Sequence, residues 1–257
     1  VQVAETCEEG NITQILTYVE TTPSCGSDAE VTVPVIDALA EREIQPEELF
    51  VDTTFGSGRN AIEAERRDTE LVSPVAGSKA GRREEAVQRT DGKLTAADFQ
   101  IDASGDQPAR CPAGHEAFDE YEECAAMERV ELRFARATCE ACPMRSRCPV
   151  ELRRQLGVYL LEADLIKVNI ERRRKAEASG EFRLRYAIRA GIEGTNSELK
   201  RAHGLGHLRV RGGRRVRLAV YLKALACNLK RMVHALLEEK FRKPPVVVEG
   251  APALVLA

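Results

Sequence analysis

Asp52 is the first residue whose type and position suggest chemistry. It follows the short apolar run 49–51, and the glycine-containing turn 53–58 comes directly after it. Sheets in α/β proteins place their ligand sites at the carboxyl ends of strands, and the turn would leave the carboxylate accessible. The alternative is an aspartate that only closes the turn or caps a helix.

Glu193 is the second such residue, and it lies in a segment with helical periodicity. An α-helix turns by about 100° per residue, so one face of the segment would carry four polar side chains. They are Tyr186, Arg189, Glu193 and Lys200. The apolar residues fall on the opposite side: Leu184, Ile188, Ile192 and Leu199. An exposed face laced with ion pairs, such as Glu193 with Arg189, is the alternative explanation.

Gly191 and Gly194 flank this glutamate, although each destabilises a helix interior by roughly 1 kcal/mol relative to alanine. Two explanations stay open. Either the helix packs tightly against a neighbour at these positions, or a DNA backbone approaches it closely.

Asp52 and Glu193 together have the chemistry of a site for divalent cations. Mg²⁺, or Mn²⁺ in its place, prefers carboxylate oxygens and keeps positions open for phosphate and water. Two such ions about 4 Å apart can activate an attacking oxygen and stabilise the leaving one.

Five of the eight cysteines cluster between positions 111 and 148. Cys139 and Cys142 form a CxxC pair, Cys148 follows, and Cys111 precedes them, so these four thiolates could hold Zn²⁺ tetrahedrally. Cys124 or His115 could replace one ligand. The alternative is a group of reduced cysteines in a small core. We interpret the isolated cysteines as ordinary structural thiols; they are Cys7, Cys25 and Cys227.

Charge is unevenly distributed along a chain whose net charge is only −3. Residues 1–70 carry 4 Lys/Arg against 16 Asp/Glu, whereas residues 171–243 carry 20 against 7. Five arginines fall within nine residues: Arg209, Arg211, Arg214, Arg215 and Arg217. Such a segment predicts phosphate contacts that do not depend on nucleotide sequence, with solvated surface arginine as the alternative. The run 172–175 is ambiguous, because the glutamates near it suit an exposed helix.

The elements that would position these residues mix strands and helices. Alternating apolar residues predict a hairpin from the segments 1–3 and 12–19, followed by a helix from about residue 27 to 43. A strand at 49–51, a helix at 60–67 and a strand at 71–75 come next. The order predicts an α/β layer with an inserted subdomain.

Beyond residue 75 the pattern favours helices. We expect loops with a little helix at 77–99 and helical structure through 150–182. A long amphipathic helix is predicted from about Arg214 to Glu239, and the tail 243–257 is predicted to be disordered. The buried side of this long helix would contain Val216, Ala219, Val220, Leu222, Leu225, Ala226, Leu229, Val233, Leu236 and Leu237.

Length and composition predict one or two globular domains, because 257 residues with 43% hydrophobic content can bury a core. No apolar run approaches the roughly 20 residues that span a bilayer, and the N-terminus has no signal-peptide pattern. We therefore expect a soluble, cytoplasmic protein without membrane contact. The start, without methionine and already alternating like a strand, is typical of a fragment.

The spacing Tyr186-x2-Arg189-x3-Glu193-x6-Lys200 resembles the Y-R-E-K signature of DDE transposases from bacterial insertion sequences. The segment 52–56 (Asp-Thr-Thr-Phe-Gly) is similar to their second aspartate motif. Further similar segments extend the resemblance over roughly residues 1–237, and they are 19–23, 191–195, 203–205 and 228–231.

The resemblance implies a ribonuclease H-like mixed sheet flanked by helices, with a cysteine-rich inserted subdomain. It also implies DNA transposition by metal-dependent phosphodiester cleavage and strand transfer. Asp52 would be the second acidic Mg²⁺ ligand and Glu193 the third, while Arg189 and Lys200 would contact DNA phosphates and Tyr186 would help to position the strand. Transposon ends and target DNA would be the partners of a homo-oligomer.

The resemblance further implies a division of the chain. Residues 1–75 and 183–242 would form the catalytic core, 76–182 the insertion, and 243–257 a tail. The family's first aspartate lies on a strand before residue 1, so we expect this chain alone to be inactive or nearly so. The alternative function is a non-catalytic, zinc-stabilised DNA-binding remnant of a decayed element.

Overall fold

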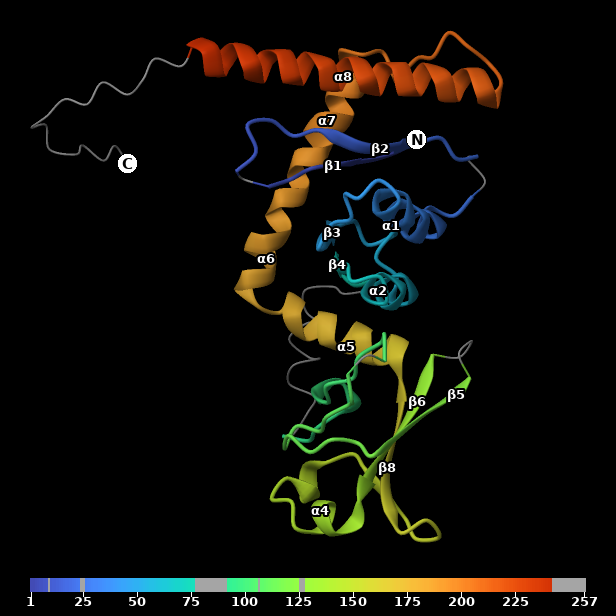
Figure 1. The fold of residues 1–257 in the computed structure, drawn as a ribbon, viewed down its shortest axis with the longest axis vertical. Coiled ribbons are helices and arrows are strands. Elements are labelled where there is room, and N and C mark those ends of the chain that lie inside the picture. Colours follow the sequence, from blue (N-terminus) through green and yellow to red (C-terminus); the bar gives the residue numbers. More distant parts are fainter. Residues whose placement is uncertain (9, 24–25, 77–91, 106, 125–127, 242–257) are drawn as a thin grey trace, which may run out of the picture. The chain divides into compact units, whose positions relative to one another are not determined.

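The computed structural model describes residues 1–8, 10–23, 26–76, 92–105, 107–124 and 128–241 (Figure 1). Its contacts divide the chain into two compact units. Val1–Thr22 and Gly191–Ala257 form what we call the hairpin unit, and Pro23–Ala190 form the central unit. The predicted tail at 243–257, most of the predicted loop at 77–99, and Cys25 lie outside the described residues, as does the side chain of Cys124.

The hairpin unit begins with the predicted antiparallel pair. Strand β1 (Gln2–Glu5) pairs with β2 (Leu16–Glu20), with Val3 opposite Val19, which confirms the hairpin. Helices α7 (Ala190–Arg201) and α8 (Gly213–Phe241) complete the unit. Its buried apolar core consists of Leu16, Leu199, Ala224 and Cys227.

Helix α8 confirms the long predicted helix, but the predicted buried side is largely wrong. Small side chains face the hairpin: Ala224 and Cys227 are buried, and the Asn228 amide donates to Leu16 O and accepts from Leu16 N, both at 2.9 Å. A closely packed strand leaves room for small residues only. The large apolar residues on the other side of α8 are about half exposed or more: Leu218, Leu222, Leu225, Leu229, Met232, Val233, Leu236 and Leu237.

The central unit opens with a small α/β layer. A 3-10 turn (Asp28–Val31) leads into α1 (Thr32–Ala40), and strand β3 (Glu48–Phe50) pairs in parallel with β4 (Glu70–Val72). Between the strands runs α2 (Gly58–Glu65), whose N-terminus is capped by Ser57. Ile36, Ala61, Ala64 and Leu71 form the core of this layer. These elements confirm the order predicted from the sequence.

A four-stranded antiparallel sheet follows, in the order β5-β6-β8-β7. Its strands are β5 (Asp119–Cys124), β6 (Arg129–Ala135), β7 (Glu151–Arg153) and β8 (Val158–Asp164). The expectation of helix through 150–182 is therefore wrong before residue 165. The reason is that β8 is buried on both faces, so its apolar residues follow one another instead of alternating with polar ones. The buried residues are Tyr159, Leu160, Leu161 and Ala163.

Helices return after β8. Helix α5 (Leu165–Glu177) is capped by Asp164, and α6 (Gly180–Tyr186) by Ser179. A short helix α4 (Arg136–Glu140) packs against β6 and β8, and a 3-10 turn at Ala96–Asp98 packs against α5. Another 3-10 turn lies at Arg145–Arg147. The core of this part includes Phe99, Leu132, Phe134 and Leu161. Mixed α/β architecture is thus observed. Within the described residues, no helix is both long and apolar enough to cross a membrane.

Candidate functional site

Asp52 lies two residues beyond Phe50, the last residue of β3, close to its predicted position at the carboxyl end of this strand. Its Oδ1 accepts hydrogen bonds from Thr54 N at 2.8 Å and Phe55 N at 3.2 Å, so the carboxylate does close the turn. Its Oδ2 lies 3.7 Å from the Arg189 guanidinium, and the side chain is 41% exposed. One oxygen therefore orients the carboxylate, and the other faces a cation at the surface.

Tyr186 and Arg189 both reach this strand end. The Tyr186 hydroxyl donates to Val51 O at 3.0 Å, and the Tyr186 ring stacks on Phe182 with centroids 5.5 Å apart. Arg189, in the 3-10 turn that follows α6, approaches the Asp52 carboxylate. Tyrosine and arginine of the signature thus contact the backbone and side chain of the aspartate motif within the central unit.

The helical segment that carries the signature is not one regular α-helix. A 3-10 turn (Ala187–Arg189) separates α6 from α7, and this tightens the winding between Tyr186 and Glu193. Leu184, expected on the buried side, is 81% exposed. The helix wheel for a continuous α-helix is therefore wrong before residue 190.

Arg173 of α5 stabilises the turn after Asp52 through hydrogen bonds. Its guanidinium donates to Gly56 O at 2.9 Å and to Ser73 O at 3.0 Å. A Cβ at Gly56 would lie 1.7 Å from Ser73 Oγ, so only glycine permits this close approach. Burial lowers the pKa of Arg173 from its ordinary value. The ambiguous run 172–175 therefore includes a structural cation beside the site.

Arg172 is also turned inward, toward the carbonyl oxygens of Ala97, Phe99 and Ile101. Lys175 pairs with Asp98 at 2.8 Å. Of the four basic residues in the run, Arg174 alone is exposed. The run mainly ties α5 to its neighbours.

Glu193 lies on the exposed face of α7, in the hairpin unit. It lines a shallow hollow of about 400 Å³ with Asn196, Ser197, Lys200 and Arg201. Glu193 and Lys200 therefore share a face, as predicted. A Cβ at Gly191 or Gly194 would meet nothing within 4 Å, so tight packing within the described part of the hairpin unit is not the reason for these glycines.

The opposite face of α7 is fixed by a network of charges around Arg231. This guanidinium donates to Glu198 at 3.0 Å, to Thr195 at 2.6 Å and to Glu5 at 3.0 Å. Lys230 and Arg231 hold the pKa of Glu198 at about 2 through hydrogen bonds to its carboxylate. With Thr195 and Leu199 buried, the outward direction of Glu193 is set by the inward packing of its neighbours.

The arginine segment precedes and begins α8. Arg209, Arg211, Arg214 and Arg215 are exposed, and Arg217 pairs with Glu20 at 3.0 Å while remaining 56% exposed. Gly212, with φ of +87°, makes the turn into the helix. Helix N-termini attract phosphate through their free N–H groups and dipole, so this segment has the electrostatics of a polyanion contact.

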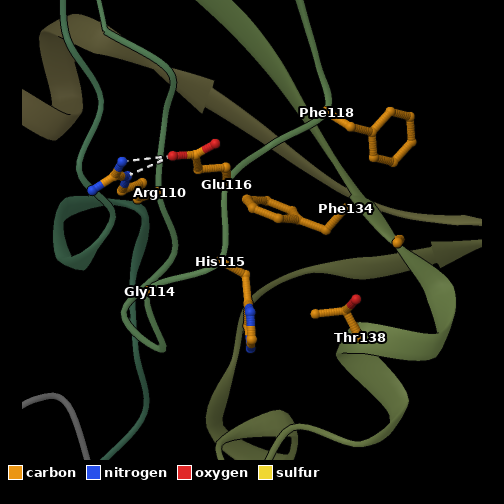
Figure 2. Close-up of a pocket in the computed structure, with 8 residues that line it drawn as sticks. Arg110, Gly114, His115, Glu116, Phe118, Phe134 and Thr138 are labelled. Atoms are coloured by element: carbon orange, nitrogen blue, oxygen red, sulfur yellow. Dashed lines mark hydrogen bonds and ion pairs between the residues drawn. The ribbon is translucent and has the colours of Figure 1, made fainter.

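The four cysteines of the predicted zinc site lie near one another in the central unit. Burial raises the pKa of Cys139 to about 11, and the thiols of Cys148, Cys111 and Cys142 add to this. The sulfur atoms do not form a preassembled set, because the group of three metal-type ligand atoms found within 4.8 Å of one another in the described chain lies elsewhere. His115 lines a separate hollow of about 530 Å³ with Phe118, Phe134 and Thr138 (Figure 2).

A family model described as "Transposase DDE domain" matches residues 110–233, somewhat less than half of the chain. The match supports a DDE-type transposase. No curated protein matches the chain. No solved structure matches it either.

The match to the DDE transposase domain contains the four cysteines and the whole Y-R-E-K spacing, but it ends short of Asp52 on the N-terminal side. Members of this family act on DNA and typically use divalent metal ions. The resemblance at Asp52 therefore depends on its own motif and on the contacts from Tyr186 and Arg189.

Sequence reasoning missed two groups of residues. Arg173 and Arg231 support the catalytic candidates from partly buried positions, and composition alone gives no signal for which arginine of a run turns inward. The second group is Glu198, His203 and Cys227, whose ligand atoms lie within 4.8 Å of one another. Their separations of five and 24 residues match no short metal-binding motif.

Proposed function

We propose that this protein acts in DNA transposition by metal-dependent phosphodiester cleavage and strand transfer. The observation that carries the proposal is the convergence of Tyr186 and Arg189 on the strand end at Asp52, together with the family match over Glu193. Asp52 and Glu193 would bind Mg²⁺ or Mn²⁺ as carboxylate ligands. The metal would lower the pKa of a bound water and stabilise the charge on the leaving oxygen.

In the proposed reaction, water attacks a DNA phosphodiester, and the bond to the 3′ oxygen breaks to leave a free 3′-hydroxyl. That hydroxyl then attacks a phosphodiester of target DNA, so a new P–O bond joins the 3′ oxygen to the target phosphate while the target's own P–O3′ bond breaks. The proton of the attacking hydroxyl passes through solvent to the 3′ oxygen that leaves. Lys200 and Arg189 would neutralise phosphate charge, and Tyr186 would hold the strand end in place. The exposed glycines of α7 would let the DNA backbone approach Glu193.

Iron-directed backbone cleavage tests the metal assignment without requiring turnover. Fe²⁺ bound in a Mg²⁺ site reduces added hydrogen peroxide to hydroxide and a hydroxyl radical, and the radical cuts the nearby chain. We expect cuts near residues 52 and 193 that excess Mg²⁺ suppresses and that Asp52→Asn and Glu193→Gln weaken. Glu181→Gln, at an exposed position of α6, is the matched control. Cuts of unchanged intensity in both variants would contradict the assignment of the metal ligands. DNA binding without metal binding would favour the non-catalytic remnant.

We further propose the ribonuclease H-like arrangement for the core segments 1–75 and 183–242, with 76–182 as the insertion. Zinc held by Cys111, Cys139, Cys142 and Cys148 would stiffen that insertion after side-chain rotation. Zinc content should fall in Cys142→Ser and not in Cys7→Ser. Equal zinc in the two variants would remove this proposal.

We also propose a homo-oligomer that binds transposon ends and target DNA in the cytoplasm. The apolar residues on the exposed side of α8 support this, because Leu218, Leu222, Leu225, Leu229, Met232 and Leu236 follow alternating steps of four and three. This is the spacing of a coiled-coil seam, and a second copy of the same helix would match it.

A further inference from the structure

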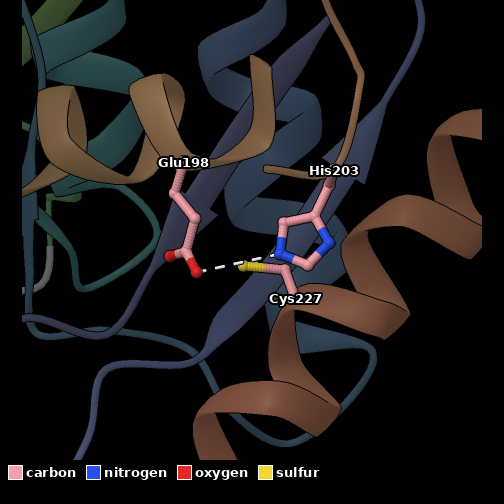
Figure 3. Close-up of side chains that lie close together, drawn as sticks. All are labelled: Glu198, His203 and Cys227. Carbon is pink, nitrogen blue, oxygen red and sulfur yellow. Dashed lines mark ion pairs between the residues drawn. The ribbon is translucent and has the colours of Figure 1, made fainter. Parts of the chain in front are cut away.

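Three side chains of different chemistry meet on the inner side of α7. Glu198 comes from the end of α7, His203 from the turn after it, and Cys227 from the middle of α8 (Figure 3). Their ligand atoms all lie within 4.8 Å of one another, and all three residues belong to the hairpin unit. This cluster lies on the face of α7 that contains Thr195 and Leu199, away from the face that exposes Glu193.

The backbone holds His203 firmly beside Glu198. Ala202 N and His203 N both donate to Glu198 O, at 2.8 and 3.3 Å, and Leu205 N donates to Leu199 O at 2.9 Å. Gly204 adopts φ of +65°, the left-handed conformation that ends many helices. The Lys223 ammonium donates to His203 O from α8. The backbone hydrogen bonds therefore fix the main chain of His203 at the C-terminus of α7.

The His203 ring presents an unsatisfied polar atom to the cluster. Its Nε2 is buried without a hydrogen-bond partner and lies 3.7 Å from Glu198 Oε1, which is too long for a hydrogen bond. Leaving such a group unpaired costs about 1–3 kcal/mol. A cation placed between the two atoms would satisfy both.

The two oxygens of Glu198 have different partners. Arg231 holds Oε2 at 3.0 Å with a side chain that is 15% exposed, whereas Lys230 approaches Oε1 at 2.8 Å with a side chain that is 60% exposed. Lys230 can swing into solvent at small cost, because an exposed ion pair contributes about 1 kcal/mol or less. Oε1 would then be available, while Arg231 would keep the carboxylate oriented.

We propose that Glu198, His203 and Cys227 bind a thiophilic divalent cation, with zinc the best match. Imidazole nitrogen, thiolate sulfur and carboxylate oxygen are the ligands that zinc takes, at about 2.0–2.3 Å. Ligand atoms on one ion then lie about 3.5 Å apart, so these three need to move by about 1 Å. Binding would join α7 to α8 and thereby fix the helix that carries Glu193.

Binding exchanges a proton for the metal. Burial raises the pKa of Cys227, so the free thiol is neutral and lies close enough to hydrogen-bond Glu198. On binding, the Cys227 S–H bond breaks, the proton leaves to solvent, and the sulfur electron pair bonds to the cation. The competing explanation is that thiol, imidazole and carboxylate form a polar cluster without metal.

Cobalt(II) tests the site, because a Co²⁺–thiolate bond gives a near-ultraviolet absorption band that carboxylate sites lack. The full chain would carry Cys139→Ser and Cys142→Ser to remove the other candidate site. We expect about one equivalent of Co²⁺ with this band, displaced by Zn²⁺. Cys227→Ser should abolish the band and His203→Gln should weaken binding at least tenfold, whereas Cys7→Ser, in the same unit, should bind as the parent does.

Circular dichroism of each variant shows whether it is folded. If the double-serine background unfolds, zinc content in the native sequence replaces the cobalt titration, with about one equivalent fewer expected in Cys227→Ser than in Cys7→Ser. A folded chain without the thiolate band, or equal metal content in these two variants, would overturn the proposal and leave the metal-free cluster as the explanation.

Discussion

The Tyr186 hydroxyl is the atom that links the signature to the aspartate motif. Its hydroxyl donates to Val51 O at 3.0 Å beside Asp52. Tyr186→Phe keeps the ring on Phe182 but removes that bond, so we expect unfolding in urea to become easier by about 1 kcal/mol. Tyr221→Phe is the matched control, because its hydroxyl meets Glu20 at the exposed surface. A loss in the control as large as in Tyr186→Phe would contradict the special role of this contact.

Glu63 predicts a pH dependence of stability. Hydrogen bonds from Arg67 and Arg66 lower the pKa of its carboxyl below 4.5. Because the folded pKa is the lower one, the stabilisation is complete above pH 4.5 and is lost as pH falls through the folded pKa. The stability difference between the parent and Glu63→Gln should therefore shrink as the pH falls below 4.5. Urea titrations across this range measure it, and a constant difference would exclude the ion pairs as its cause.

At the scale of elements, α5 supports the turn that follows Asp52. Arg173→Met would leave Gly56 O and Ser73 O without this donor, at a cost of about 2–3 kcal/mol in the free energy of unfolding. Arg174→Met changes the exposed neighbour and should cost less than about 0.5 kcal/mol. Chemical denaturation of the two variants compares them directly. Equal effects would mean that the turn is held without Arg173.

The apolar stripe of α8 gives a prediction about assembly. Leu225 is 63% exposed at the middle of the heptad-spaced residues. Leu225→Glu should lower the apparent mass at micromolar concentration while the helix content stays constant, since a charge in a coiled-coil seam opposes pairing. Light scattering after gel filtration measures the mass. A monomeric parent, or an unchanged oligomer in the variant, would show that this stripe does not join two copies.

Periodicity predicts individual elements better than it predicts their partners. It placed the hairpin, β3 and α2 correctly because their apolar spacing is simple. It failed at Val158–Asp164, where a continuous apolar run suits a buried strand as well as a helix. It also failed on α8, whose two apolar sides do not reveal which one meets Leu16. In both cases the outcome depends on packing between distant segments, and the spacing of apolar residues within one segment does not show this packing.

The same reason separates the predictable part of the site from the rest. Asp52 and Glu193 stay predictions from their motifs, and their positions after a strand and on a helix follow from local sequence. Arg231 and His203 depend on how β2 and α8 pack against α7, and β2 is far from both helices in sequence. Long-range contacts of this kind become visible only after folding.

At the scale of the whole molecule, the two ends of the sequence carry opposite net charge. The first 70 residues have 16 acidic and 4 basic side chains, and residues 171–243 have 7 and 20. Since the overall charge is only −3, the proposed DNA contact would depend on local segments rather than on a general attraction. The exposed arginines at the start of α8 are the clearest such segment.

Replacing Arg214 and Arg215 by glutamine tests this segment. If each contacts one phosphate, the slope of log affinity for duplex DNA against log salt should become shallower by about 2, uniformly across DNA sequences. Fluorescence anisotropy at several salt concentrations measures the slope. Arg174→Gln removes an exposed arginine outside the segment and should leave the slope unchanged. Equal loss in both proteins would mean that DNA senses the total charge, and the start of α8 would then lose its status as the contact surface.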